Sequence, residues 1–243
     1  MDRALYVVGC RMHCLAEDLQ TVAANVANAS TPGYKRTVNC FHAVLRGVKS
    51  VGVRQSGTCA AEWTRLGSPQ LDMAQGPVSR TGRSLDVAIQ GDAFLVVSTP
   101  RGQRYTRKGR LYLNASGDLT DALGNPFAAR GGGLNIPPGA RNVSIQRDGR
   151  LLADGRPLGA LMLVDIPEPD KLVAEGAGLY RYEGARPERS LTSQVIQGAI
   201  EESNVQPVKE LVGLVELMRA FESGSRVMRR LDALNNKLIQ TAS

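Results

Sequence analysis

The sequence predicts an α+β fold: long N- and C-terminal helices form a coiled-coil terminal domain, and the central domain is all-β, antiparallel and sandwich- or barrel-like. Two observations support this prediction. Apolar residues near both chain ends recur with spacings of three and four, and turn residues between short apolar runs crowd the middle. We therefore divide the 243 residues into an N-terminal helix (1–30), an extended connecting segment (31–75), a central β domain (76–185), a linker (186–202) and a C-terminal helix (203–243).

The N-terminal helix is expected to begin at Asp2, a good N-cap residue, and to reach about Asn28. It ends there because Pro32 disfavours helical backbone at Thr31, and Gly33 permits a turn. Its apolar seam, which we interpret as an assembly surface, consists of Leu5, Val8, Met12, Leu15, Leu19, Val22 and Val26.

The middle of the chain carries the signals of β structure. Residues 94–97 (FLVV) form a short apolar run typical of a buried strand, and residues 158–166 contain the longest such run. The pairs at 148–149 and 154–155 are both Asp-Gly, which supplies the positive φ that tight hairpins require. Strands at this spacing predict an antiparallel meander.

The C-terminal helix is predicted from Ser203 or Asn204, either of which can act as its N-cap, and Pro207 falls in the first turn. Ser225 and Asn235 are polar positions within its seam. They serve either to select register and partner or as tolerated defects, and the sequence leaves both interpretations open. The apolar members of this second assembly seam are Leu211, Leu214, Met218, Phe221, Met228, Leu231 and Leu238.

Composition argues against several classes of protein. The net charge is +7, but only 5% of the residues are aromatic, whereas a nucleic-acid surface combines basic and aromatic side chains. No apolar run approaches the roughly 20 residues that span a bilayer. We therefore expect neither nucleic-acid binding nor membrane insertion. The opening residues also lack the basic, apolar and small-residue regions of a cleavable secretory signal.

The sequence carries no arrangement typical of an enzyme. It has only two histidines, no Ser-His-Asp set that can be placed and no glycine-rich phosphate loop opening a helix. We predict no catalytic residues, no cofactor and no small-molecule substrate.

Four cysteines are present, at Cys10, Cys14, Cys40 and Cys59. Cys10, His13 and Cys14 fall within one helical turn, and thiolates with imidazole suit zinc, but the spacing matches no standard zinc motif. Small packing residues are the favoured interpretation, with a metal site and a disulfide as the alternatives. We predict no metal site.

Three stretches resemble one family. Residues 24–35 (ANVANASTPGYK) are similar to the N-terminal signature of the axial proteins of the bacterial flagellum, which include the rod and hook subunits. Residues 85–97 and 105–109 resemble the β-domain motif of the rod and hook proteins, and residues 202–222 resemble their C-terminal motif. The opening residues 1–6 (MDRALY) are closest to the proximal rod proteins. The motif residues singled out are Asn25, Asn28, Thr31, Pro32, Gly33 and Tyr34.

The chain departs from the pattern in its cysteines, in Val26, where a second Asn is usual, and in Ala29, where a branched residue is more usual.

The resemblance implies a self-assembling structural subunit of the proximal rod, the drive shaft for motility in the flagellar basal body. It implies other rod and axial subunits as partners, export through the flagellar type III apparatus without a cleaved signal peptide, and a place in the periplasmic rod. A distal rod or hook-type subunit is the alternative within the family. A cytoplasmic coiled-coil adaptor is a more remote one.

Overall fold

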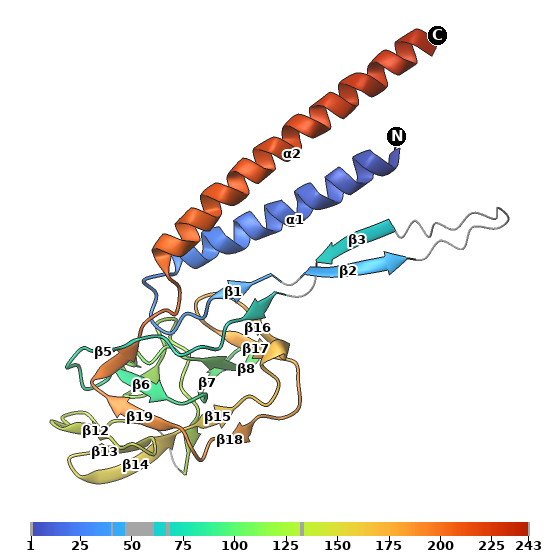
Figure 1. Ribbon diagram of the computed structural model, residues 1–243. Helices are drawn as coiled ribbons and strands as arrows, with labels where there is room; N and C mark the ends of the chain where they lie inside the picture. The colour runs from blue at the N-terminus through green and yellow to red at the C-terminus, as the bar shows by residue number, and fades with distance from the viewer. Residues whose placement is uncertain (1, 40, 47–60, 67–68, 132–133, 243) are drawn as a thin grey trace. The chain divides into compact units, whose positions relative to one another are not determined.

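The chain forms two compact units, each made of segments that are far apart in the sequence (Figure 1). The computed structural model describes residues 2–39, 41–46, 61–66, 69–131 and 134–242. The helical unit comprises Met1–Ala27, Thr37–Gln70 and Gln206–Ser243, and the β-rich unit comprises Asn28–Arg36 and Leu71–Val205. Residues 28–36, which follow the first helix directly, therefore belong to the β-rich unit.

The helical unit contains the two α-helices of the described chain, α1 (Asp2–Ala27) and α2 (Pro207–Ala242). They lie side by side (Figure 1), and Gly224 of α2 faces Met12 of α1 so closely that a Cβ atom would collide with the Met12 sulfur. Strands β2 (Phe41–Arg46) and β3 (Ala61–Leu66) pair antiparallel in the same unit. Strands β1 (Thr37–Val38) and β4 (Gln70–Leu71) form a further two-stranded pair.

The predicted coiled-coil terminal domain is wrong. The described chain has one α-helix at each end and a β-rich middle, and the seam side chains that the structure describes are half-buried or exposed, not fully buried as in a coiled-coil core. Leu211 and Met218 are 48% and 50% exposed, whereas Asn25, which lies outside the seam, is completely buried. The heptad spacing showed only that apolar residues recur along each helix, and α1 also buries the polar side chain of Asn25 against Thr37, in the segment that follows it. Neither helix, over its described length, is apolar enough to cross a membrane.

The β-rich unit is built around a six-stranded sheet with the order β16-β17-β8-β7-β15-β18. Every pairing that the structure describes in this sheet is antiparallel. The strands are β7 (Phe94–Thr99), β8 (Gly102–Thr106), β15 (Leu163–Asp165), β16 (Leu172–Ala174), β17 (Tyr180–Tyr182) and β18 (Glu188–Arg189). A short 3₁₀ helix, Pro169–Lys171, precedes β16.

A four-stranded sheet with the order β11-β14-β13-β12 and three strand pairs complete the unit. The four-stranded sheet contains β11 (Ala129–Arg130), β12 (Val143–Ile145), β13 (Arg150–Ala153) and β14 (Arg156–Leu161). The pairs are β9 (Tyr112–Leu113) with β10 (Leu119–Thr120), β6 (Val87–Gln90) with β19 (Gln194–Gln197), and β5 (Val78–Arg80) with β20 (Ala199–Glu201).

Strand β7 separates two hydrophobic clusters. Leu95 and Val97 face the larger cluster, and Phe94 and Val96 face the smaller one. All four side chains are at most 1% exposed. Because alternate strand residues point to opposite faces, a continuous apolar run is what a strand buried on both sides requires. Burying such side chains stabilises the fold by roughly 1.5–3 kcal/mol each.

Candidate functional site

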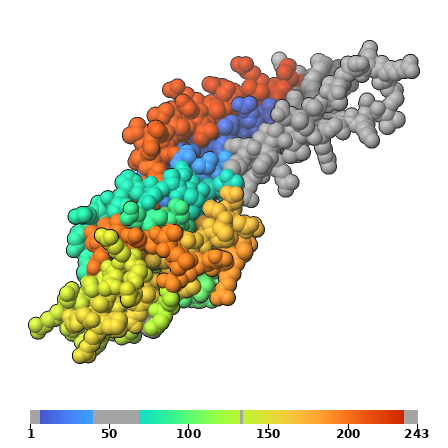
Figure 2. Space-filling model, turned by 60° about the horizontal axis from the view of Figure 1, so that its bottom comes forward, coloured from blue at the N-terminus to red at the C-terminus, as the bar shows by residue number. Residues whose placement is uncertain are grey.

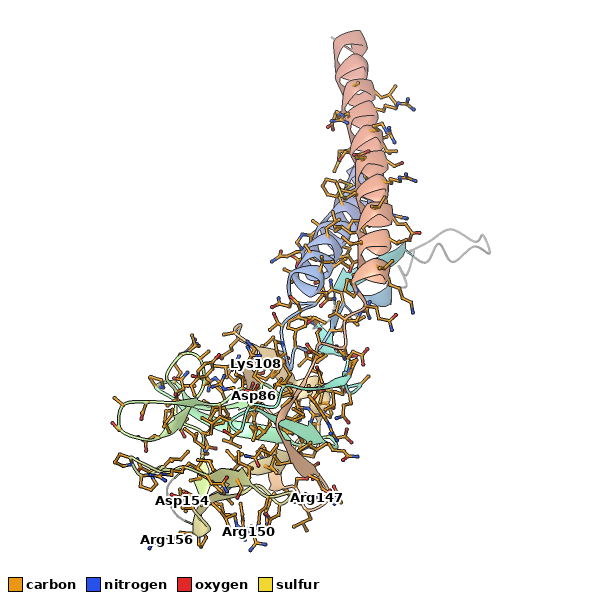
Figure 3. The ribbon with its side chains drawn as sticks, turned by 90° about the vertical axis from the view of Figure 1, so that its left-hand side faces the viewer. Asp86, Lys108, Arg147, Arg150, Asp154 and Arg156 are labelled. Atoms are coloured by element: carbon orange, nitrogen blue, oxygen red, sulfur yellow. The ribbon has the colours of Figure 1, made fainter. Side chains whose placement is uncertain are left out.

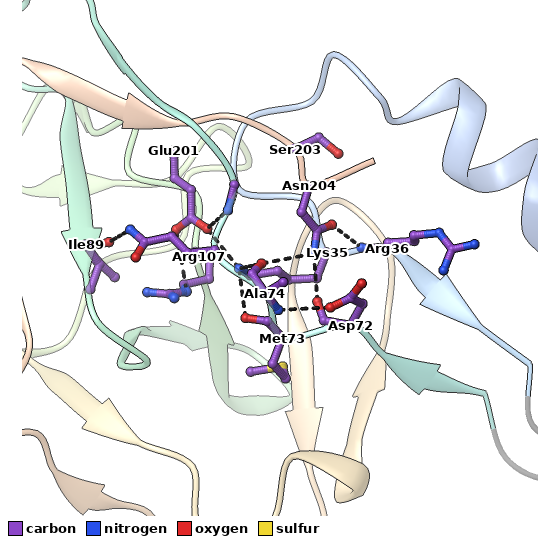
Figure 4. Close-up of polar contacts among 12 residues, drawn as sticks. Lys35, Arg36, Asp72, Met73, Ala74, Ile89, Arg107, Glu201, Ser203 and Asn204 are labelled. Carbon is purple, nitrogen blue, oxygen red and sulfur yellow. Dashed lines mark hydrogen bonds and ion pairs between the residues drawn. The ribbon is translucent and has the colours of Figure 1, made fainter. Parts of the chain in front are cut away.

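A buried ion pair connects the segment after α1 with the last strand before α2, inside the β-rich unit (Figure 4). The Lys35 ammonium donates to Oε1 of Glu201 over 2.8 Å, and both side chains are 1% exposed. The ammonium also donates to the carbonyl of Ala74 over 2.8 Å, and the Gly76 N–H donates to the same Glu201 oxygen over 3.1 Å. The pair therefore holds three separate stretches of backbone together.

Arg107 adds a second buried cation beside Glu201. Its two terminal nitrogens donate to the carbonyls of Ala93 and Gly91 over 2.8 and 2.6 Å, and its guanidinium lies 5.4 Å from the centre of the Phe94 ring. Nε lies 3.6 Å from Oε2 of Glu201, and neither atom has a hydrogen bond to any described residue. Among the described carboxylates, Glu201 is the one that lies within ion-pair distance of both cations.

Burial shifts the ionisation of this cluster. Removal from water lowers the pKa of Lys35, and the charge and hydrogen bond of Glu201 oppose that shift without cancelling it. Removal from water also lowers the pKa of Arg107, again against the attraction of Glu201. The neighbouring Tyr180, whose hydroxyl oxygen accepts from the Lys35 N–H over 3.2 Å, has its pKa raised by burial to about 12.

Glycine allows the backbone of the N-terminal motif to approach the central motif. Gly33 has φ +69°, and a Cβ atom there would lie 2.5 Å from the carbonyl carbon of Arg107. Its N–H donates to the backbone oxygen of Glu201 over 2.7 Å. A side chain at position 33 would therefore meet backbone that cannot move without disturbing the ion pair.

Asn204 makes a second connection between the N- and C-terminal motifs (Figure 4). Its side-chain oxygen accepts from the N–H of Arg36 over 2.7 Å, and its amide nitrogen donates to the carbonyls of Asp72 and Ala74 over 2.8 and 3.0 Å. The predicted N-cap residue thus bonds to the segments beside it, and α2 begins three residues later, at Pro207.

In the helical unit, the side chain of Asn25 likewise bonds to the backbone of a neighbouring segment. Its side chain donates to the carbonyl of Thr37 over 2.8 Å and accepts from the Thr37 N–H over 2.9 Å. It also lies 3.4 Å from Oε2 of Glu210, which is 5% exposed. This polar contact fastens the end of α1 to β1 and to the first turns of α2.

The remaining motif residues form the turn that follows α1. The Thr31 N–H donates to the carbonyl of Asn28 over 3.0 Å, and the Thr31 hydroxyl lies 3.2 Å from the Asn28 side-chain oxygen. The Tyr34 N–H donates to the carbonyl of Thr31 over 3.2 Å. Pro32 lines a small pocket of about 170 Å³ beside Lys108.

The predicted N-terminal seam lies along α1, and its described side chains are half-buried. This holds for Val8, Met12, Leu15, Leu19, Val22 and Val26, whereas the side chain of Leu5 lies outside the described residues.

The predicted C-terminal seam divides between two faces of α2. The half-buried members are Leu214, Phe221, Met228 and Leu231, with the polar Ser225 among them. Leu211 and Met218 are exposed, and the side chains of Asn235 and Leu238 are outside the described set.

Sequence reasoning missed an exposed apolar stripe on α2. Figure 2 shows the surface of this helix in orange to red. Val208, Val212 and Val215 are 75%, 56% and 49% exposed. With Leu211 and Met218 they recur at spacings of three and four, which places them on one helix face. The spacing of these five residues is visible in the sequence, but the heptad pattern predicted a seam on the neighbouring face of the helix.

The ion pair itself could not be found from spacing, because 166 residues separate Lys35 from Glu201. Cys14 is buried, Cys10 is half-buried and both are free thiols, while Cys40 and Cys59 lie outside the described residues. Within the described ranges, no three His, Cys, Asp or Glu side chains gather where they could hold a metal ion.

Three family models match the chain, and each matched segment supplies one charged residue of the buried cluster. Residues 5–35 match a model described as flagella basal body rod protein, and they include Lys35. Residues 88–153 match the flagellar hook protein FlgE/F/G D1 domain and include Arg107. Residues 196–241 match the flagellar basal body rod FlgEFG protein C-terminal model and include Glu201.

Known rod proteins resemble the chain over almost its whole length. The flagellar basal-body rod protein FlgF of Caulobacter vibrioides is 33% identical over 99% of this chain and 98% of its own length. FlgF of Salmonella typhimurium is 31% identical over 100% of this chain and 99% of its own length. FlgG of Buchnera aphidicola is 31% identical over 92% of this chain and 93% of its own length. These relatives support the predicted role of a structural subunit of the proximal rod. The chain belongs to the family of flagellar basal-body rod proteins.

Proposed function

We propose that this chain takes its place in the proximal rod by packing the exposed apolar stripe of α2 against neighbouring axial subunits. The observation that supports the proposal is the exposure of Val208, Leu211, Val212, Val215 and Met218 on one face of a long helix. Isolated exposed apolar residues are ordinary, but a contiguous row of them marks a surface that another protein covers.

The half-buried seams have a different part in this proposal. The N-terminal seam and the half-buried members of the C-terminal seam hold α1 and α2 to each other, so that the helical unit presents the stripe in a fixed position. Contact between neighbouring subunits then buries the stripe, and this burial supplies the driving force for assembly.

The β-rich unit serves as the stable body of the subunit. Its ion pair of Lys35 with Glu201 joins the two segments that lead to α1 and α2. We infer a mechanical and not a catalytic role, because the relatives are structural rod proteins and the buried charges act on the fold. Rotation loads a rod subunit repeatedly, and buried polar contacts of defined geometry resist a change of register.

Delivery belongs to the same proposal. The subunit reaches the rod through the flagellar type III export apparatus and resides in the periplasmic part of the basal body. Family membership supports both steps.

Purification of basal bodies from cells that produce an epitope-tagged chain tests this proposal. We expect the tagged chain to co-purify with intact basal bodies and to be lost when the export apparatus is inactivated. Recovery of the chain only from the cytosol, with basal bodies intact, would contradict it.

A further inference from the structure

A basic groove on the β-rich unit has no role in the proposed packing of α2. It has a volume of about 540 Å³, and its floor is the chain at 160–163, where β14 leads into β15. Arg130 of β11 and Arg189 of β18 both line it. The groove continues into an adjoining hollow of about 510 Å³, which the same two arginines also line together with Arg150.

The charges of this groove are only partly balanced. Asp148 is the one carboxylate among its described lining residues, and Arg150 engages it through its backbone N–H over 3.1 Å and through Nε over 2.5 Å. Slight burial raises the pKa of Asp148, but these hydrogen bonds outweigh burial and hold the pKa below its ordinary value. Arg130 and Arg189 have no ion pair with any side chain that the structure describes. Two guanidinium groups are therefore available to an anion.

The walls of the groove suit an extended chain. β11 and β18 are the outermost strands of their sheets, so each leaves backbone groups on one edge without a neighbouring strand. Leu191, two residues after β18, is 82% exposed and lines the same groove as the floor residues Leu161 and Leu163. An extended peptide can bond to such edges and place alternate side chains in the groove.

We propose that this groove binds an extended acidic peptide of another protein, with carboxylates against Arg130 and Arg189 and an apolar side chain against Leu191. Planar guanidinium groups bind carboxylates through paired hydrogen bonds. The net charge of +7 favours an acidic partner over a second copy of this basic chain. No aromatic side chain occurs among the described lining residues, so the groove lacks the stacking surface of a single-stranded nucleic-acid site.

Fluorescence anisotropy with the full-length protein and a short labelled peptide of alternating Glu and Leu tests the proposal, at about 0.15 M salt. We expect saturable binding, and much weaker binding of the same peptide with Gln in place of Glu. Arg130→Glu combined with Arg189→Glu should raise the Kd at least about tenfold.

The matched control is Arg141→Glu combined with Arg156→Glu. It changes the net charge equally at exposed arginines of the same unit that do not line the groove. Arg150 and Arg156 lie with Arg147 and Asp154 at the four-stranded-sheet end of this unit (Figure 3). The control should change the Kd less than about twofold.

Several results would overturn the proposal. Equal weakening by both double variants would show general charge attraction, and equal binding of the Glu and Gln peptides would remove the role of the carboxylates. Absence of saturable binding would remove the site. Self-association that requires Arg130 and Arg189 would make a second copy the occupant. If the Glu double variant does not fold, Arg130→Gln with Arg189→Gln gives the same test, with an expected loss of at least about threefold.

Discussion

The ammonium of Lys35 and the carboxylate of Glu201 meet at 2.8 Å across 166 residues of sequence, with both side chains 1% exposed. Lys35 follows α1 closely, and Glu201 ends β20, six residues before α2 begins. The pair therefore ties together the two segments of the β-rich unit that lead to the helices. Arg107 from the central motif lies beside the same carboxylate. All three recognisable motifs meet at this point.

Lys35→Met should destabilise the β-rich unit by roughly 1.5–3 kcal/mol, because Glu201 Oε1 and the Ala74 carbonyl lose their charged hydrogen-bond donor, while Arg107 still faces the carboxylate. Urea denaturation followed by circular dichroism measures the change. Lys171→Met is the matched control, since Lys171 pairs with Glu168 at 2.7 Å but both side chains are about half exposed, at 50% and 47%. The control substitution should leave the midpoint of the urea denaturation curve almost unchanged. A similar loss in both variants would contradict a special role for burial.

Gly33→Ala should destabilise the protein by more than the roughly 1–2 kcal/mol that a left-handed backbone costs a residue with a side chain. The added methyl group would lie 2.5 Å from the Arg107 carbonyl carbon. Gly155→Ala provides the comparison, because Gly155 has a similar φ of +80°, but a methyl group added there would have no atom within 4 Å apart from those of its two chain neighbours. Thermal unfolding of both variants separates backbone strain from the clash. Equal losses would mean that the close approach is unimportant.

The sequence predicted some parts of this molecule for physical reasons that the structure bears out. The apolar run at 94–97 forms a strand buried on both faces, and the Asp-Gly pairs at 148–149 and 154–155 lie between paired strands. The motifs identified the family, and the relatives confirm it.

The coiled coil was wrong because periodicity shows that an apolar stripe exists and does not show what covers it. On α2 the predicted seam and the exposed stripe share Leu211 and Met218, and the heptad pattern could not show which of the two faces α1 covers. The buried cluster was also beyond sequence reasoning, since charged residues such as Lys35 are normally exposed and only the fold brings Glu201 to it. The seams as assembly residues remain a prediction.

Tyr180 should make stability fall as the pH rises from about 10 to about 12. Burial raises its pKa to about 12 in the folded state from the ordinary value of 10.0. The unfolded chain therefore releases the phenolic proton first, and the stability that is present below pH 10 is lost through this window, by about 2–3 kcal/mol. Burial also lowers the pKa of Lys35 and of Arg107, so the measurement is the difference between wild type and Tyr180→Phe. Parallel pH profiles for the two proteins would contradict the prediction.

Val212→Asp or Val215→Asp should abolish motility while leaving the β-rich unit folded, because each places a carboxylate in the surface that neighbouring subunits cover. Swimming in soft agar and circular dichroism of the purified variant measure the two effects. Lys209→Asp is the control, since Lys209 is exposed on the same turns of α2 but lies outside the stripe. Motile cells carrying either valine variant would remove the stripe from the assembly surface.

Electron microscopy of basal bodies from a strain that lacks this gene tests the place of the chain in the rod most directly. Axial structures are built in sequence, so later subunits have nothing to build on when a proximal one is missing. We predict basal bodies without a complete rod, hook or filament, and recovery of all three when the wild-type gene is restored. A deletion strain that still assembles a complete rod would contradict the assignment of this chain to the proximal rod.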